Sequence, residues 1–217
     1  MPNISTINGV DITTLASFGG VAFADGQTLD GQNVALASEA HTFISSQTAS
    51  SSSSLSFTSG IDSTYDVYEW HFINMHPSTS SNFSFQVNAV SQTGFNEVIT
   101  SSAFRSYNNE ADTSANLEYR TGSDQAQGTA YQPLAESVPT DADQSVSGIL
   151  TLYAPSDTTY VKHFTGVVFG NFFGAASGRQ HTAGYINTTS AIDEVSFKFA
   201  SGNIDAGEVR MYGVATS

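Results

Sequence analysis

Apolar and polar residues alternate along most of this chain, and the alternation predicts β-strands. The clearest case runs from residue 191 to 214, where Val195, Phe197 and Phe199 occupy every second position. This is the period of a strand that packs one face and exposes the other. A second strand is predicted at 208–214. The connection contains three residues of types that adopt positive φ: Gly202, Asn203 and Gly207. We therefore expect two antiparallel strands to close the chain.

The same alternation predicts further strands upstream. Residues 65–75 carry bulky side chains on both parities, so we expect a central strand there. The other predicted strands lie at 83–89, 98–99, 117–119, 147–153 and 160–169. No stretch longer than about ten residues has the 3.6-residue period of a helix. Since Gly and Ser mark the turns, the pattern predicts an all-β fold, an antiparallel β-sandwich of jelly-roll type.

A short repeat occupies the N-terminal region. Ile7-Asn8-Gly9-Val10 recurs as Phe18-Gly19-Gly20-Val21 and, more weakly, as Leu29-Asp30-Gly31-Gln32, each copy beginning eleven residues after the last. Each copy predicts short strands joined by a tight turn. Ordering a residue costs about 1–2 kcal/mol of backbone entropy, so such a segment needs a partner surface. It is either an assembly arm, contacting other proteins through Ile7, Val10, Phe18 and Val21, or an extra strand pair packed on its own domain.

A run of Ser and Thr at 45–54 predicts an exposed loop or linker. The expected organisation is an arm at 1–44, this linker at 45–54, and a sandwich domain at 55–217. A chain of 217 residues is long enough for one such domain with a core of its own.

Composition excludes several partners. Twenty acidic residues against six basic ones give a net charge of −14, which argues against nucleic acid and against anionic lipid. Cysteine is absent, so disulfides and thiolate metal sites are excluded. The first residues lack the basic and apolar regions of a signal peptide, and no run of eighteen apolar residues occurs. We expect a soluble protein without membrane insertion.

Catalytic motifs are not evident in this sequence. None of the histidines has a metal-ligand spacing, and there is no Gly-x-Ser-x-Gly elbow. Glu69 stands alone on its predicted strand, and His71 is its expected partner. Asp193 and Glu194 are adjacent and therefore point to opposite faces. We predict no catalytic residue, no cofactor and no metal, although acid-rich loops at 108–112 and 141–143 leave calcium as an alternative.

Aromatic residues supply the remaining candidate sites. Four tyrosines are candidate glycan contacts because sugars stack on aromatic rings: Tyr107, Tyr119, Tyr131 and Tyr185. The alternative is that these rings close the ends of the sandwich or contact other subunits. The segment 169–178 is too apolar for a solvated loop, and its Phe172 and Phe173 predict a subunit interface.

Several segments resemble the jelly-roll virion proteins of tailed bacteriophages. They are Tyr65-Asp66-Val67-Tyr68-Glu69, the stretches 147–155 and 191–197, and Tyr212-Gly213. The N-terminal repeats are similar to those of tail-fibre and appendage proteins. Together the similar regions cover residues 5–34 and 60–214. The resemblance implies a trimeric structural protein on the exterior of a phage particle, without a cofactor, attached to other virion proteins.

The function expected from the sequence is therefore that of a non-enzymatic virion protein. Within that class it is a tail-fibre or appendage component contacting the host surface, or a head decoration protein that stabilises the capsid. A glycan-binding module or glycan depolymerase is the alternative from another class.

Overall fold

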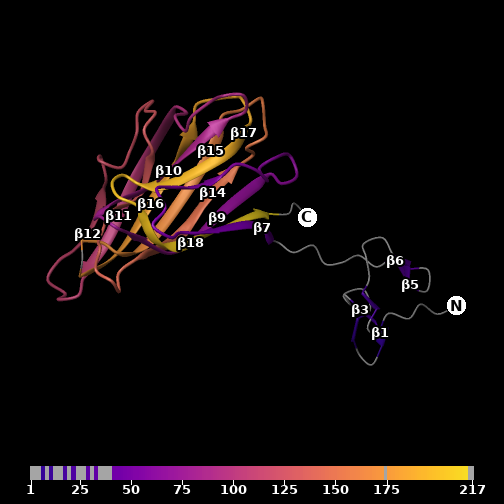
Figure 1. The fold of residues 1–217 in the computed structure, drawn as a ribbon, viewed down its shortest axis with the longest axis horizontal. Helices are drawn as coiled ribbons and strands as arrows, with labels where there is room; N and C mark the ends of the chain where they lie inside the picture. The colour runs from indigo at the N-terminus through magenta and orange to yellow at the C-terminus, as the bar shows by residue number, and fades with distance from the viewer. Residues whose placement is uncertain are drawn as a thin grey trace. The chain divides into compact units, whose positions relative to one another are not determined.

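The computed structural model describes residues 41–173 and 175–214, together with six two-residue strands in the first 40 residues. The chain divides into two compact units, one formed by Met1–Ala40 with Ser217 and the other by His41–Thr216. The larger unit is a β-sandwich (Figure 1). It consists of two packed antiparallel sheets, which confirms the predicted fold class. The jelly-roll topology stays a prediction.

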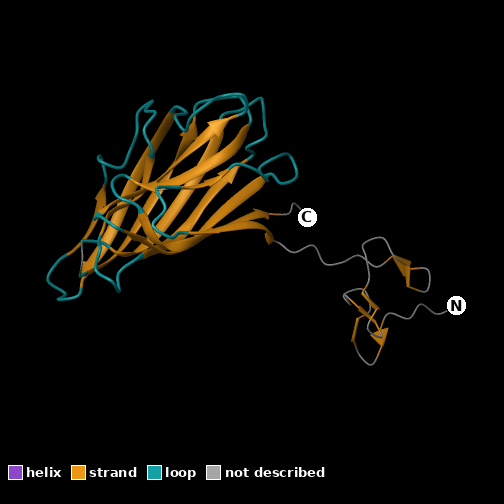
Figure 2. Cartoon of the chain, in the orientation of Figure 1, coloured by secondary structure: helices purple, strands orange, loops and turns teal. Residues whose placement is uncertain are grey.

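The larger sheet has eight strands in the order β12-β11-β16-β15-β14-β9-β18-β7, and the smaller has four in the order β13-β10-β17-β8. The strands are β7 (His41–Thr48), β8 (Leu55–Phe57), β9 (Val67–Pro77), β10 (Ser81–Ala89), β11 (Ile99–Asn109), β12 (Ala115–Tyr119), β13 (Gln132–Val138), β14 (Val146–Tyr153), β15 (Lys162–Asn171), β16 (Ala176–Ile186), β17 (Ile192–Phe199) and β18 (Ile204–Val214). Figure 2 shows strands and loops throughout the described residues. In that part of the chain, no helix is long and apolar enough to span a membrane.

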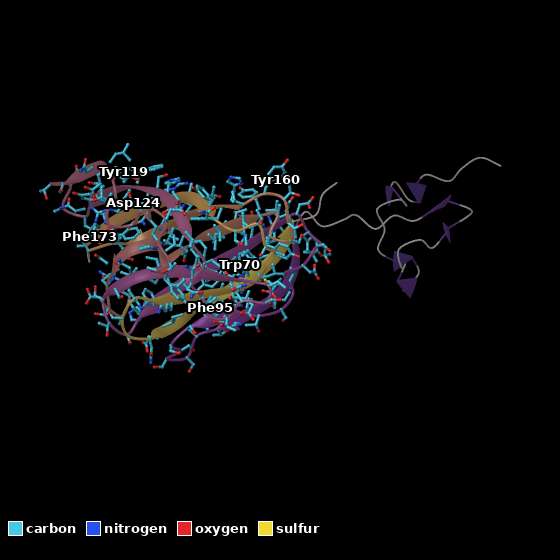
Figure 3. The ribbon with its side chains drawn as sticks, turned by 90° about the horizontal axis from the view of Figure 1, so that it is seen from above. Trp70, Phe95, Tyr119, Asp124, Tyr160 and Phe173 are labelled. Atoms are coloured by element: carbon cyan, nitrogen blue, oxygen red, sulfur yellow. The ribbon has the colours of Figure 1, made fainter. Side chains whose placement is uncertain are left out.

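Aromatic side chains fill the space between the sheets. Trp70 on β9 is 0% exposed, and Figure 3 shows it in the interior of the sandwich. Phe72 on the same strand packs edge-on against Phe83 of β10 and Phe197 of β17, with ring centroids 5.1 and 5.0 Å apart. These rings come from the two facing sheets, so the alternation seen in the sequence marks the inner face of each sheet.

The two closing strands exist, but they are not neighbours in one sheet. β17 pairs with β10 and β8 in the smaller sheet, whereas β18 pairs with β9 and β7 in the larger one. Residues 200–203 cross between the sheets, with Gly202 at φ 70°. Gly207 also has a positive φ, whereas Asn203 does not. Both strands bury one face in the same core, which is why their alternation looks like that of a hairpin.

The predicted linker at 45–54 is wrong for its first four residues. They belong to β7, which pairs along β18 at the edge of the larger sheet. The rest of the segment connects to β8, and the N–H of Ala49 donates to the carbonyl of Gly207 at 2.8 Å. An edge strand needs only backbone partners on one side, so a hydroxyl-rich sequence can form it. The sandwich thus begins at His41 and not at residue 55.

The predicted central strand is confirmed as β9. Near its end, the alternation of inward- and outward-facing side chains shifts by one residue. Asn74 has a φ of 51°, and its N–H donates to Ser147 Oγ at 3.1 Å. The pairing of β9 with β14 is irregular at this point, as expected at a β-bulge. Met75 consequently turns into the core instead of sharing the outer face with Ile73.

The middle of the chain contains more strand than its sequence predicts. β11 has eleven residues where only 98–99 were expected, and β13 and β16 were not expected at all. These strands carry many Ser, Thr, Ala, Gly and Gln residues, which weaken an apolar alternation. Pairing with neighbouring strands, and not local apolar pattern, places them in the sheets.

In the N-terminal unit the three sequence repeats coincide with three antiparallel strand pairs. β1 (Thr6–Ile7) pairs with β2 (Val10–Asp11), β3 (Ser17–Phe18) with β4 (Val21–Ala22), and β5 (Thr28–Leu29) with β6 (Gln32–Asn33). The turn residues between them lie outside the described part of the chain. The assembly role of Ile7, Val10, Phe18 and Val21 stays a prediction.

Candidate functional site: the open face of the larger sheet

The outer faces of the two sheets differ in what covers them. On the smaller sheet, Gln86 points outward from β10 yet is 0% exposed. Its amide donates to the carbonyls of Glu97, Thr129 and Ala130 at 3.0–3.2 Å. These carbonyls belong to the connections before β11 and before β13. The chain therefore folds its own loops over the polar side of the smaller sheet.

The outer face of the larger sheet, which we call the open face, has no such cover among the described residues. Several large apolar side chains on it are 37–69% exposed: Phe43, Phe104, Leu117, Tyr119, Ile149, Tyr153 and Phe169. Strand register places a row of residues side by side across six strands: His71, Ile149, Val167, His181, Phe104 and Tyr119. At a strand spacing of about 4.8 Å, this row extends about 24 Å.

A groove of about 470 Å³ lies in the middle of the open face. It is lined by Glu69, Ile149, Thr151, Thr165, Val167, Phe169 and Arg179, from strands β9, β14, β15 and β16. Two smaller hollows adjoin it. One shares Phe169 and Arg179 with the groove and includes Tyr107. The other shares Thr165 and Val167 and includes Phe104 and His181. The volume is in the range of small-molecule sites.

Glu69 at one end of the groove is held in place by two imidazoles. The Nε2 atoms of His41 and His71 lie 3.1 and 2.9 Å from the same carboxylate oxygen, Oε2. His71 was the partner expected from the sequence, and His41 comes from β7. The ring of Tyr212 lies 4.8 Å from that of His71 and limits its movement. The other oxygen, Oε1, has no hydrogen bond among the described residues.

Arg179 at the opposite end differs from the other three arginines. Arg105, Arg120 and Arg210 each form ion pairs with glutamates. Lys162 is buried, which lowers its pKa, and its Nζ donates to the carbonyl of Tyr160 at 2.8 Å. Within residues 41–173 and 175–214, Arg179 has no carboxylate partner and is exposed. Its guanidinium can therefore reach a bound molecule.

The rings of His181 and Phe104 stack face to face beside the groove. Their rings are nearly parallel, at 6°, with centroids 4.7 Å apart. Burial lowers the pKa of His181, and the positive charge of Arg179 lowers it further. The neutral imidazole is therefore favoured at neutral pH, and the stacked pair is uncharged.

A second cluster of charged groups is structural. Glu136 on β13 accepts hydrogen bonds from Arg105 of β11, from Arg120 and from Ser123. Glu118 of β12 also pairs with both arginines, and the hydrogen bond from Arg105 lowers the pKa of its carboxyl group. Arg105 and Glu136 are buried. The cluster joins the two sheets at one edge of the sandwich.

The predicted interface residues separate in the structure. Phe172 is 0% exposed and lies in the core, against Gly178, where a Cβ atom would overlap its ring. Its predicted role in a subunit interface is therefore wrong, because the ring closes the sandwich end. Phe173 is 49% exposed, with Arg105 4.2 Å from its ring centroid. It remains a candidate contact.

The four predicted glycan-contacting tyrosines do not form one site. Tyr107 lines a hollow beside the groove. Tyr119 is exposed and donates to Asp124 at 2.7 Å, at the end of the sandwich where Phe173 also lies (Figure 3). Tyr131 covers Lys198 on the smaller sheet, 4.2 Å from ring centroid to Nζ. Tyr185 lies on β16, on the open face.

Most groove residues were missed by sequence reasoning; the exceptions are Glu69 and Phe169, which opens the apolar segment 169–178. The groove residues come from four strands that are distant in the chain, so no local motif unites them. One feature of the sequence could have indicated the groove. After His163, the outward-facing positions of the strand at 160–169 are Thr165, Val167 and Phe169, which carry hydroxyl or apolar side chains and no charge. As for metals, no group of three or more His, Asp or Glu side chains in the described residues could hold an ion.

A scan against protein families found no family that matches this chain, and a search of curated proteins found no match.

Proposed function

We propose that this chain is a non-enzymatic structural protein displayed on the exterior of a bacteriophage particle, where its sandwich contacts the host surface. The observation that carries the proposal is the difference between the two outer faces. The chain covers the polar face of its smaller sheet with its own loops but leaves exposed aromatic side chains on the larger one. Exposed apolar patches of this kind mark interaction surfaces.

The N-terminal strand pairs support the attachment part of the proposal. Three two-residue pairs recur at the spacing of the repeats, in a unit separate from the sandwich. Strands this short bury too little surface to be stable alone. Docking of the arm on another virion protein would supply the missing contacts. The resemblance of these repeats to phage appendage proteins points the same way.

Binding, and not hydrolysis, is favoured by the groove. A glycosidase of the common kind needs two carboxyl groups about 5–9 Å apart. Of the described residues lining the groove, only Glu69 is acidic. One oxygen of its carboxylate is already engaged by His41 and His71. We therefore place the chain among binding proteins and not among depolymerases.

Immunogold labelling of intact particles tests the proposal. Antibodies raised against the sandwich should label purified particles of the phage that encodes this chain, and labelling at the tail would place it on a fibre or appendage. Labelling spread over the head would instead support a decoration protein. If intact particles remained unlabelled while the free protein was bound, the proposed exterior location would be wrong.

A further inference from the structure

We propose that the groove on the open face binds a neutral hexose oligosaccharide. This inference rests on the proposed function, because it names the ligand of the same surface. The groove combines an apolar floor with a polar rim, and the two match the two kinds of surface that a pyranose ring presents.

The floor is formed by Ile149, Val167 and Phe169. Phe169 is 52% exposed, so its ring is available for stacking. The C–H face of a pyranose is apolar and packs on aromatic rings and branched aliphatic side chains. Ile149 and Val167 are direct neighbours in the sheet, which makes the floor continuous across two strands.

The rim offers both acceptors and donors to sugar hydroxyls. Glu69, Thr151 and Thr165 stand side by side on three neighbouring strands. The free Oε1 of Glu69 can accept a hydroxyl proton, and the threonine hydroxyls can donate or accept. Arg179, on the far side of the floor, supplies N–H donors without a carboxylate partner in the described residues. From β9 to β16 the groove crosses about 14 Å, which suits several linked rings.

Charge selects against anionic glycans. The chain has a net charge of −14, and one end of the groove is a carboxylate. A polyanionic ligand would be repelled at long range, and one guanidinium offsets little of this. A neutral sugar satisfies both Glu69 and Arg179 through hydroxyl groups without adding charge.

Sheet topology selects against a peptide strand in the groove. The four strands that form it are interior strands of the larger sheet. Their backbone N–H and C=O groups are already used by neighbouring strands, so an extended peptide could not add to them. Only side chains face the groove, and a buried peptide backbone would lack partners. Sugar hydroxyls, by contrast, are matched by side-chain groups.

The test uses the full-length chain. Binding would be screened on an array of linear tri- and tetrasaccharides of glucose, galactose and mannose, with uronate and sulfated oligosaccharides as the anionic arm. Isothermal titration would then measure affinity for the strongest neutral ligand. Two variants probe the groove, Phe169→Ala for the floor and Arg179→Gln for the rim. Tyr160→Ala is the matched control, because Tyr160 is 71% exposed and does not line the groove; it lies at the end of the sandwich away from Tyr119 and Phe173 (Figure 3).

We expect neutral oligosaccharides to bind. Phe169→Ala should weaken binding about tenfold, because truncation of an aromatic anchor removes its stacking contact. Tyr160→Ala should leave the affinity unchanged. Thermal melts should show that all three variants remain folded. Binding only to anionic sugars, or binding indifferent to both groove variants, overturns the inference. So does the absence of binding to every neutral oligosaccharide on the array. Particle labelling is measured independently, so the proposed function survives or fails on its own result.

Discussion

At the scale of single residues, the carboxylates of this protein differ most in how far they are buried. Glu136 is 5% exposed, and its carboxylate accepts hydrogen bonds from three side chains, two of them arginines. Glu208 forms a bidentate pair with Arg210 on the surface, with distances of 3.0 and 2.9 Å. A buried ion pair loses much more than a surface pair when one partner is removed, because an uncompensated charge stays in the interior.

Replacement of Glu136 therefore gives the first prediction. Glu136→Gln removes the charge partner of Arg105 on β13 and leaves Glu118 as its remaining carboxylate, and we expect the free energy of unfolding to fall by about 1–3 kcal/mol. The measurement is urea denaturation followed by tryptophan fluorescence, which reports on the buried Trp70. Glu208→Gln is the matched control, and it should change the unfolding midpoint very little. Equal effects of the two substitutions would contradict a structural role for the buried cluster.

The second prediction concerns pH. Burial and Arg179 hold the pKa of His181 below 6.5, the value expected for an exposed histidine. The unfolded state therefore binds more protons as pH falls through 6.5, and stability contributed by neutral His181 is lost toward the lower folded pKa. Phe104 of β11 and Val167 of β15 flank the imidazole and add no charge.

Urea midpoints measured between pH 7 and pH 5 should thus decline in the native chain, and the decline should be shallower in His181→Gln. The comparison of the two slopes isolates His181 from the other histidines. If both slopes were the same, the burial of His181 would have no energetic consequence.

At the scale of elements, the edge strand β7 of the larger sheet determines where the sandwich domain begins. β7 pairs along most of β18, and its Ile44 packs against the core. Without β7, the backbone groups of β18 on that side would be exposed, and an exposed sheet edge promotes aggregation. The Ser-rich sequence of residues 45–54 predicted a linker and therefore gave no indication of this role of β7.

Two truncations test the boundary. A chain of residues 41–217 keeps every strand of both sheets, and we expect it to unfold cooperatively near the temperature of the full-length protein. A chain of 55–217 lacks β7 and should melt at a lower temperature and aggregate, as measured by differential scanning fluorimetry and light scattering. Similar behaviour of the two truncations would show that β7 is dispensable.

At the scale of the whole molecule, the proposed function assigns attachment to the N-terminal unit and contact with the host surface to the sandwich. The arm consists of short strand pairs, and the sandwich has its own aromatic core. The high negative charge opposes self-association over long distances. Any oligomer must therefore depend on local apolar contacts, which the arm repeats were predicted to supply.

Removal of the arm provides the fourth prediction. We expect the full-length chain to form a trimer in solution and the chain of residues 41–217 to be a monomer, because the assembly contacts are placed in the repeats. Multi-angle light scattering measures both masses. A charge-conserving control is Ile7→Ser with Phe18→Ser in the full-length chain, which should also lower the mass. A truncated chain that kept the full oligomer mass would instead place the interface on the sandwich, with Phe173 as a candidate contact.

Much of the fold could be predicted from the sequence where strands carry bulky residues. The strands around Trp70, Phe85, Leu150, Phe164 and Phe197 were found because alternation of large apolar side chains is a local property. The strands β11, β13 and β16 were missed or shortened, since small and hydroxyl side chains do not reveal which face is buried. Of the groove residues, only Glu69, with its expected partner His71, and Phe169 in the segment 169–178 were singled out from the sequence.

The sequence by itself determined the all-β character, the hairpin repeats of the arm and the acidic charge, because each depends on residue types and short spacings. Tertiary structure alone decided that β17 and β18 lie in different sheets, that loops cover Gln86, and that Glu69 and Arg179 share one groove. The physical reason is that alternation reports whether a side chain faces the core or away from it. The alternation carries no information on which strands are neighbours in the sheet, and the groove is formed by side chains from neighbouring strands.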